Sequence, residues 1–296
     1  MRVFVTGATG FIGSAVVREL LDAGHEVVGL ARSDEKAASL AATGAEVLRG
    51  DLTDLDSLRR GAEDSDGVIH TAFVHDWANY GKSIETEEQV LTALGEVLAE
   101  SDRPLVVSSG IAAVGTPGRP VTEQDPSDPS WSRIVSERTA FSFVERGVRA
   151  SALRLAPTVH GEGDHGFVPM VIDTARKTGV SAYPGDGANR WPAVHRFDAA
   201  NLFRLAVKSA PAGTMLHATA EEGVPVREIA EVIGRHLNLP VQSIPVEESA
   251  GHFGFVGPFF ARDVWVSSTW TRERFGWQPV QPDLIADLEK GHYFTD

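Results

Sequence analysis

Short apolar runs and longer amphipathic stretches alternate through the first half of the chain. Short apolar runs predict buried strands, and apolar residues spaced three or four positions apart predict helices. Strands are predicted over Arg2–Thr6, Glu26–Ala31, Glu46–Arg49, Gly67–Thr71, Pro104–Ser108 and Ala150–Leu155. Helices are predicted over Ile12–Ala23, Lys36–Ala42, Leu55–Ala62, Ile84–Glu100 and Ser132–Arg146.

This alternation predicts an α/β fold, a Rossmann-type doubly wound parallel sheet with right-handed crossovers. The pattern loosens after Pro157, so we expect one domain over residues 1–157 and a small C-terminal lobe over 158–296, interleaved with the last sheet elements. In the second part we predict helices over Phe167–Thr178, Val226–Leu237, Arg272–Gly276 and Pro282–Lys290, and strands over Thr214–Thr219 and Val241–Pro245. Gly251–Ala261 is predicted as a loop or a mobile helix over a pocket.

Composition restricts the possible partners and the location. The 296 residues include no cysteine, which excludes disulfides, thiolate catalysis and cysteine-ligated metals. The formal net charge of −14 disfavours binding to nucleic acid or to anionic membranes. Met1 leads directly into the first predicted strand, and no apolar run reaches the roughly 20 residues needed to span a membrane. We therefore expect a cytoplasmic protein.

The most specific motif joins the first predicted strand to the first helix and reads Thr6-Gly7-Ala8-Thr9-Gly10-Phe11-Ile12-Gly13. Gly7 permits a tight turn, Gly10 lets the backbone approach a diphosphate, and Gly13 lets the helix pack close to the strand. The helix N-terminus adds N–H donors and a partial positive charge. The motif therefore predicts that residues 1–157 bind a dinucleotide and that the smaller lobe binds the substrate.

Further segments support a family resemblance. They are Gly50-Asp51-Leu52, His70-Thr71-Ala72, Val106-Val107-Ser108-Ser109-Gly110, the run from Arg154 to Gly161, and the run from Trp191 to Asp198. Together with the glycine turn, they resemble the extended and atypical branches of the short-chain dehydrogenase/reductase superfamily, the NAD(P)-dependent epimerase/dehydratase-like proteins. The resemblance implies cofactor contacts from Thr6, Gly7, Thr9, Gly10, Phe11, Ile12, Gly13, Asp51, Leu52, Thr71, Ala72, Phe73, Ser108, Pro157, Val159 and His160.

The end of the second strand indicates which dinucleotide is preferred. NAD-binding relatives usually place an acid there, whereas this chain has Ala31 followed by Arg32 and Ser33. A guanidinium and a hydroxyl can bind the 2′-phosphate that an acid would repel. We therefore predict NADP(H), with Arg32 and Ser33 as cofactor-binding residues.

The residues that usually perform the chemistry are replaced. The resemblance implies a proton-donating Tyr and, four residues later, a Lys, and our alignment places Ile134 and Arg138 at these positions. Arg138 could still hold a ribose hydroxyl, but Ile134 cannot transfer a proton. The candidate catalytic residues are then Ser108 and Ser109, at the end of the fifth strand, with His160 and Tyr183. No metal site is expected, because the histidines are scattered.

Three functions remain open. The first is an NADPH-dependent reductase or dehydrogenase for a carbonyl, quinone or aromatic substrate, favoured by aromatic residues between Phe253 and Trp265 that could line a pocket or simply be core. The second is a non-catalytic NADP-binding sensor, and the third a nucleotide-sugar epimerase or dehydratase. A homodimer through helices 84–100 and 132–146 is also predicted, although their apolar faces could instead be core.

Overall fold

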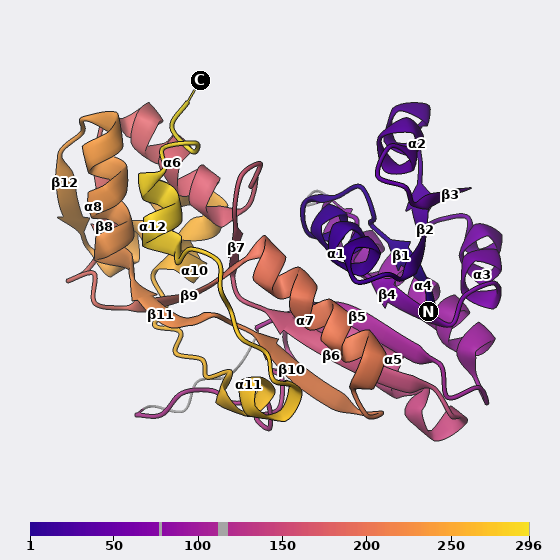
Figure 1. Cartoon of the computed structure of the whole chain (residues 1–296). Helices are drawn as coiled ribbons and strands as arrows, with labels where there is room; N and C mark the ends of the chain where they lie inside the picture. Colours follow the sequence, from indigo (N-terminus) through magenta and orange to yellow (C-terminus); the bar gives the residue numbers. More distant parts are fainter. Residues whose placement is uncertain (77–78, 112–117, 296) are drawn as a thin grey trace.

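The computed structural model describes residues 1–76, 79–111 and 118–295 and is built around a seven-stranded sheet (Figure 1). The order is β10-β6-β5-β4-β1-β2-β3, and every pair is parallel. The strands are β1 (Arg2–Thr6), β2 (Glu26–Ala31), β3 (Glu46–Arg49), β4 (Gly67–His70), β5 (Pro104–Gly110), β6 (Arg149–Leu155) and β10 (Thr214–Ala218). The predicted doubly wound α/β fold is confirmed. The strand order reverses between β1 and β4, where such folds bind ligands beyond the carboxyl ends of the strands.

Helices cover both faces of this sheet because its strands alternate their apolar side chains between two cores. On one face, α1 (Phe11–Asp22) and α7 (Arg196–Ser209) pack against Val5, Ile69 and Val106. On the other face, α3 (Leu55–Glu63), α4 (Tyr80–Leu98) and α5 (Val135–Phe141) pack against a set that includes Phe4 and Val107. Helix α2 (Asp34–Ala41) connects β2 to β3.

A smaller lobe lies beyond the carboxyl end of β6 (Figure 1). It contains a three-stranded sheet, β11-β9-β7, and a two-stranded sheet, β12-β8, around a core that includes Trp191. Its strands are β7 (Thr158–His160), β8 (Ser181–Pro184), β9 (Arg190–His195), β11 (Glu221–Pro225) and β12 (Val241–Ile244). Its helices are α6 (Phe167–Thr178), α8 (Val226–Leu237), α9 (Ser249–Phe253), α10 (Gly257–Phe260) and α12 (Leu284–Glu289). Helix α11 (Thr269–Phe275) returns towards β10.

Several elements differ from the prediction. The long helix expected over Ser132–Arg146 is wrong: only α5 is α-helical, between 3₁₀ turns at Ser132–Ile134 and Val144–Arg146. Ser142 donates to the carbonyl of Thr139 there, a local bond that competes with helix continuation. Helix α7 and strands β7, β8, β9 and β11 were not predicted. Short helices occupy most of Gly251–Ala261, where a loop or a helix was predicted.

Candidate cofactor and substrate site

The glycine turn joins β1 to α1 at the strand-order reversal. Gly7 has a φ of +69°, which favours glycine. A Cβ on Gly13 would collide with the carbonyl oxygen of Gly7, so only glycine lets the helix approach the turn this closely. A Cβ on Gly10 would meet only that same oxygen, at 3.2 Å. The space in front of Gly10 is therefore open, and the first-turn N–H groups of α1 are available to an anion.

A buried chain of hydrogen bonds holds the elements around this turn. Thr6 Oγ1 lies 2.7 Å from His70 Nδ1, and His70 Nε2 lies 3.1 Å from Glu87 Oε2. Ser136 donates to the other oxygen of Glu87 at 2.6 Å. Burial alone would raise the pKa of Glu87, but His70 and the bond from Ser136 lower it overall. The chain connects β1, β4, α4 and α5, and Thr71 donates to the carbonyl of Thr6 beside it.

At the end of β2, Ala31 is buried and Arg32 is exposed. Arg49, at the end of β3, donates to the carbonyl of Arg32 at 3.2 Å and pairs with Asp34 at 3.1 Å, so the side chain of a second arginine reaches this edge together with an acid. Ser33 caps α2 by accepting from the N–H of Lys36 at 3.3 Å, which still leaves its hydroxyl proton for another acceptor. The edge could therefore hold a phosphate.

Ser108 and Ser109 lie at the end of β5, and their side chains point to opposite faces of the sheet because consecutive strand residues alternate. Both are buried. Ser109 donates to Glu137 Oε1 at 2.8 Å, and Glu137 is paired with Arg154. The Ser109 hydroxyl proton is thus committed within the protein. The catalytic role of either serine stays a prediction.

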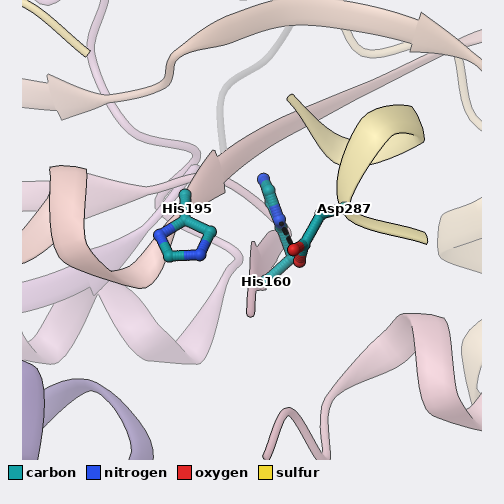
Figure 2. Close-up of side chains that lie close together, drawn as sticks. All are labelled: His160, His195 and Asp287. Atoms are coloured by element: carbon teal, nitrogen blue, oxygen red, sulfur yellow. Dashed lines mark hydrogen bonds and ion pairs between the residues drawn. The ribbon is translucent and has the colours of Figure 1, made fainter. Parts of the chain in front are cut away.

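The other two catalytic candidates belong to the smaller lobe. Tyr183 lies in β8, where the guanidinium of Arg227 is 5.6 Å from its ring centroid. His160 is fully buried at the end of β7, and its Nδ1 lies 3.0 Å from Asp287 Oδ2 of α12. Figure 2 shows this pair beside the ring of His195. Hydrogen bonds from His160 and Lys290 outweigh burial and lower the pKa of Asp287 to about 2.

His160, His195 and Asp287 are also the residues within the described ranges whose ligand atoms could meet at a metal, all within 4.8 Å of one another. Nδ1 of His195 accepts from the N–H of Phe197, so the proton of a neutral His195 lies on Nε2. His160 donates its Nδ1 proton to Asp287. The His160–Asp287 bond ties α12 to β7, while Nε2 of His160 is buried without a hydrogen-bond partner among the described residues.

The α5 region shows one residue that the sequence reasoning missed. Arg138 is 63% exposed and pairs with Glu88 at 3.3 Å. Arg133, one turn earlier, instead places its guanidinium carbon 3.7 Å from the centroid of Phe73, which directly follows Thr71 and Ala72, two of the predicted cofactor contacts. Its position before α5 could have marked it, but the alignment favoured Ile134 and Arg138.

Two sets of apolar residues serve the core. Phe253 and Phe260 are buried with Trp191 in the core of the smaller lobe, whereas Phe255 is 45% exposed. On the predicted dimer helix 84–100, Leu91 and Leu94 are fully buried within the chain. The homodimer stays a prediction. Among the residues that the structure describes, no helix is both long and apolar enough to cross a bilayer.

The chain matches known proteins over its whole length. The model of the NAD dependent epimerase/dehydratase family matches residues 3–217. An uncharacterised protein of Schizosaccharomyces pombe is 52% identical over 295 residues, covering 99% of this chain and 100% of the relative. The UDP-glucose 4-epimerase of Streptomyces lividans is 29% identical, covering 98% and 96%. The 2′-dehydrokanamycin reductase of Streptomyces kanamyceticus is 30% identical, covering 84% and 71%.

Solved structures share the fold. The dTDP-glucose 4,6-dehydratase of Streptomyces venezuelae, crystallised with NAD, superposes with a TM-score of 0.78 at 21% identity. The match covers 99% of this chain and 96% of the dehydratase. The arrangement of large sheet and smaller lobe is therefore the one found in such enzymes.

Proposed function

We propose that this chain, which belongs to the NAD dependent epimerase/dehydratase family, is an NADP(H)-dependent oxidoreductase acting on a small carbonyl, quinone or aromatic substrate. The glycine turn supports dinucleotide binding through the open approach to Gly10 and the close packing at Gly13. The observation that carries the cofactor choice is the end of β2, where Ala31 takes the place of an acid and Arg32 is exposed. The 2′-dehydrokanamycin reductase supports a reductase activity by its name.

The residues present fit such a cofactor. The first-turn N–H groups of α1 would bind the diphosphate, and Arg32 and Arg49 would bind a 2′-phosphate. A bound nicotinamide supplies or accepts a hydride. Two contacts of Phe11 narrow the access of solvent to the glycine turn. The Phe11 ring centroid lies 5.8 Å from the ring centroid of His165 and 5.1 Å from the guanidinium carbon of Arg196. These contacts bring the smaller lobe over the glycine turn and would limit the access of water.

Cofactor choice is tested by titrating NADPH and NADH against the wild type and the Arg32→Ala variant, following cofactor fluorescence. We expect the wild type to prefer NADPH and the variant to lose roughly tenfold or more in NADPH affinity, with little change for NADH. Equal wild-type affinities for the two cofactors would remove the NADP(H) assignment.

Activity is tested by following NADPH oxidation with a panel of aldehydes, ketones and quinones. Saturable turnover supports the oxidoreductase and eliminates the sensor. Cofactor binding without turnover on any panel member supports the sensor instead. UDP-glucose and dTDP-glucose belong in the same panel, because the relatives include a UDP-glucose epimerase and a dTDP-glucose dehydratase. Conversion of either sugar nucleotide would favour the third function.

A further inference from the structure

Arg133 is a half-buried cation without a full set of partners. Its Nη1 is shielded from solvent and has no hydrogen-bond partner in the described chain. Burial lowers the pKa of this guanidinium, and Glu87 acts in the opposite direction. A guanidinium carries five N–H donors, and leaving one of them buried and unused costs free energy. No hydrogen bond within the described chain uses the other N–H groups of Arg133 either, and because the residue is only half-buried, a ligand oxygen could reach those donors.

Glu87 is the acid that interacts most strongly with the charge of Arg133, and both of its oxygens already have hydrogen-bond partners. One oxygen of Glu87 accepts from Ser136 and the other lies 3.1 Å from His70. Arg133 rests instead on an aromatic surface, 3.7 Å above Phe73, and the Phe73 ring in turn lies 5.1 Å from His75 and 6.1 Å from Tyr80. Stacking on Phe73 fixes the guanidinium but uses none of its N–H donors.

The stack lies beside the strand-order reversal that also carries the glycine turn, the place where doubly wound folds hold ligands in a crevice. Phe73 follows Thr71 and Ala72, which are the residues that a Cβ on Gly7 would touch. They lie past the end of β4, next to β1, where the strand order reverses. Arg133 contacts Phe73 from the 3₁₀ turn that precedes α5, a separate segment of the chain.

We propose that Arg133 donates hydrogen bonds to a ligand oxygen in this crevice, and so forms an oxygen-binding subsite of the proposed oxidoreductase. The subsite takes a neutral or anionic oxygen acceptor, either a ribose hydroxyl of the cofactor or the carbonyl or carboxylate oxygen of the substrate. Arg138, exposed and paired with Glu88, does not have an unused buried donor of this kind. The inference rests on the proposed function, because it needs a dinucleotide or its substrate in the crevice.

The test compares Arg133→Met, which keeps an unbranched apolar stem and removes the donors, with Arg146→Met. Arg146 is a matched control: it stacks on Phe143 at 4.8 Å and is exposed. NADPH affinity is measured by fluorescence titration. The affinity of the NADPH complex for benzoylformate and for 4-nitrobenzaldehyde is measured by quenching of the bound NADPH fluorescence, so neither measurement needs turnover.

We expect Arg133→Met to lower the affinity for one of these ligands by roughly ten- to a hundredfold. Arg146→Met should change none of the affinities by more than about twofold. A loss of NADPH affinity assigns the oxygen to the cofactor, and a loss confined to the carbonyl probes assigns it to the substrate. If Arg133→Met does not fold, Arg133→Lys is used, which keeps the charge but loses the fork of donors and should weaken the same ligand.

Unchanged affinities in an Arg133→Met protein that melts at the wild-type temperature overturn the subsite while leaving the proposed function standing. A wild type that binds neither NADPH nor NADH overturns the proposed function, and the subsite with it.

Discussion

Arg154 and Glu137 form a doubly hydrogen-bonded ion pair inside the protein, with 3.0 Å between Nε and Oε1 and 3.2 Å between Nη2 and Oε2. Their side chains are only 3% and 5% exposed. Arg154 lies in β6 and Glu137 in α5, and Ser109 and Ser127 donate to the same carboxylate. The pair therefore fixes the wall of the site that carries the candidate serines.

Replacing Glu137 by Gln should destabilise the protein by about 3–5 kcal/mol, because it leaves the buried Arg154 cation without a counter-charge. Urea unfolding measures the loss. The control is Asp263→Asn, which breaks the surface pair with Arg190, whose side chains are 34% and 48% exposed. That change should cost less than about 1 kcal/mol. Similar costs for the two substitutions would contradict the structural role of the buried pair.

Two glycines of the turn should respond differently to alanine. Gly10→Ala should fold normally and lose roughly tenfold or more in cofactor affinity, because its Cβ projects into the open approach where a diphosphate would lie. Gly13→Ala should lose both stability and binding, because its Cβ collides with the carbonyl oxygen of Gly7. Thermal melts and cofactor titration separate the two effects.

Gly81→Ala provides the control for these substitutions. Gly81 lies in α4, and a Cβ added there meets nothing within 4 Å. Since alanine favours a helix, this variant should gain up to about 1 kcal/mol and bind cofactor as the wild type does. Equal cofactor binding by Gly10→Ala and Gly81→Ala would argue against a diphosphate at the turn.

The sequence was sufficient for the large sheet because its signals are local. Buried strands and the glycine turn each occupy a few consecutive residues, and β1, β2 and β3 begin and end where predicted. The smaller lobe depends on distant partners, such as His160 with Asp287, 127 residues apart. Helix α7 was missed because its cap is His195, which is not a typical N-cap residue.

The candidate site also has a part that local sequence signals predict and a part that depends on contacts between distant segments. The glycine turn, proposed to bind the diphosphate, follows from a contiguous motif. The stack of Arg133 on Phe73 joins two segments that only the fold brings together, so no spacing in the sequence marks it. Arg133 and Arg138 lie about one turn apart in the same irregular helical segment. An alignment alone could therefore assign the ligand-binding cation to Arg138.

Stability should fall with pH below about 6.5 because of His195. Burial and the neighbouring His160 lower the pKa of His195 from 6.5 to about 4. Between these values the unfolded chain binds a proton that the folded chain does not, so lowering the pH favours unfolding. The loss between pH 7.5 and 5 is about 2 kcal/mol. Urea unfolding at pH 7.5 and at pH 5 measures it.

His195→Asn tests the assignment, because Asn keeps an acceptor for the N–H of Phe197 at the start of α7 but does not titrate. The variant should lose less stability than the wild type between pH 7.5 and 5. Asp287 acts lower: with its pKa held at about 2, the stability it contributes is lost only as the pH falls from about 4 towards 2. An unchanged pH dependence in His195→Asn would assign the effect to another group.

Cofactor choice should be reversible at Ala31, the last residue of β2. An Asp there would bring a carboxylate to the edge that holds Arg32 and receives Arg49, and it would repel a 2′-phosphate while accepting from a 2′-hydroxyl. We expect Ala31→Asp to lower NADPH affinity roughly tenfold or more and to lower NADH affinity less, or to raise it. Ala41→Asp adds the same charge at the exposed end of α2 and should leave the ratio of the two affinities unchanged.

Because Ala31 is buried, a melt of each variant must show that the fold is retained before the ratios are compared. A parallel fall for both cofactors in Ala31→Asp would mean that the end of β2 does not contact the 2′ position, and Arg32 would then have to act at another part of the cofactor.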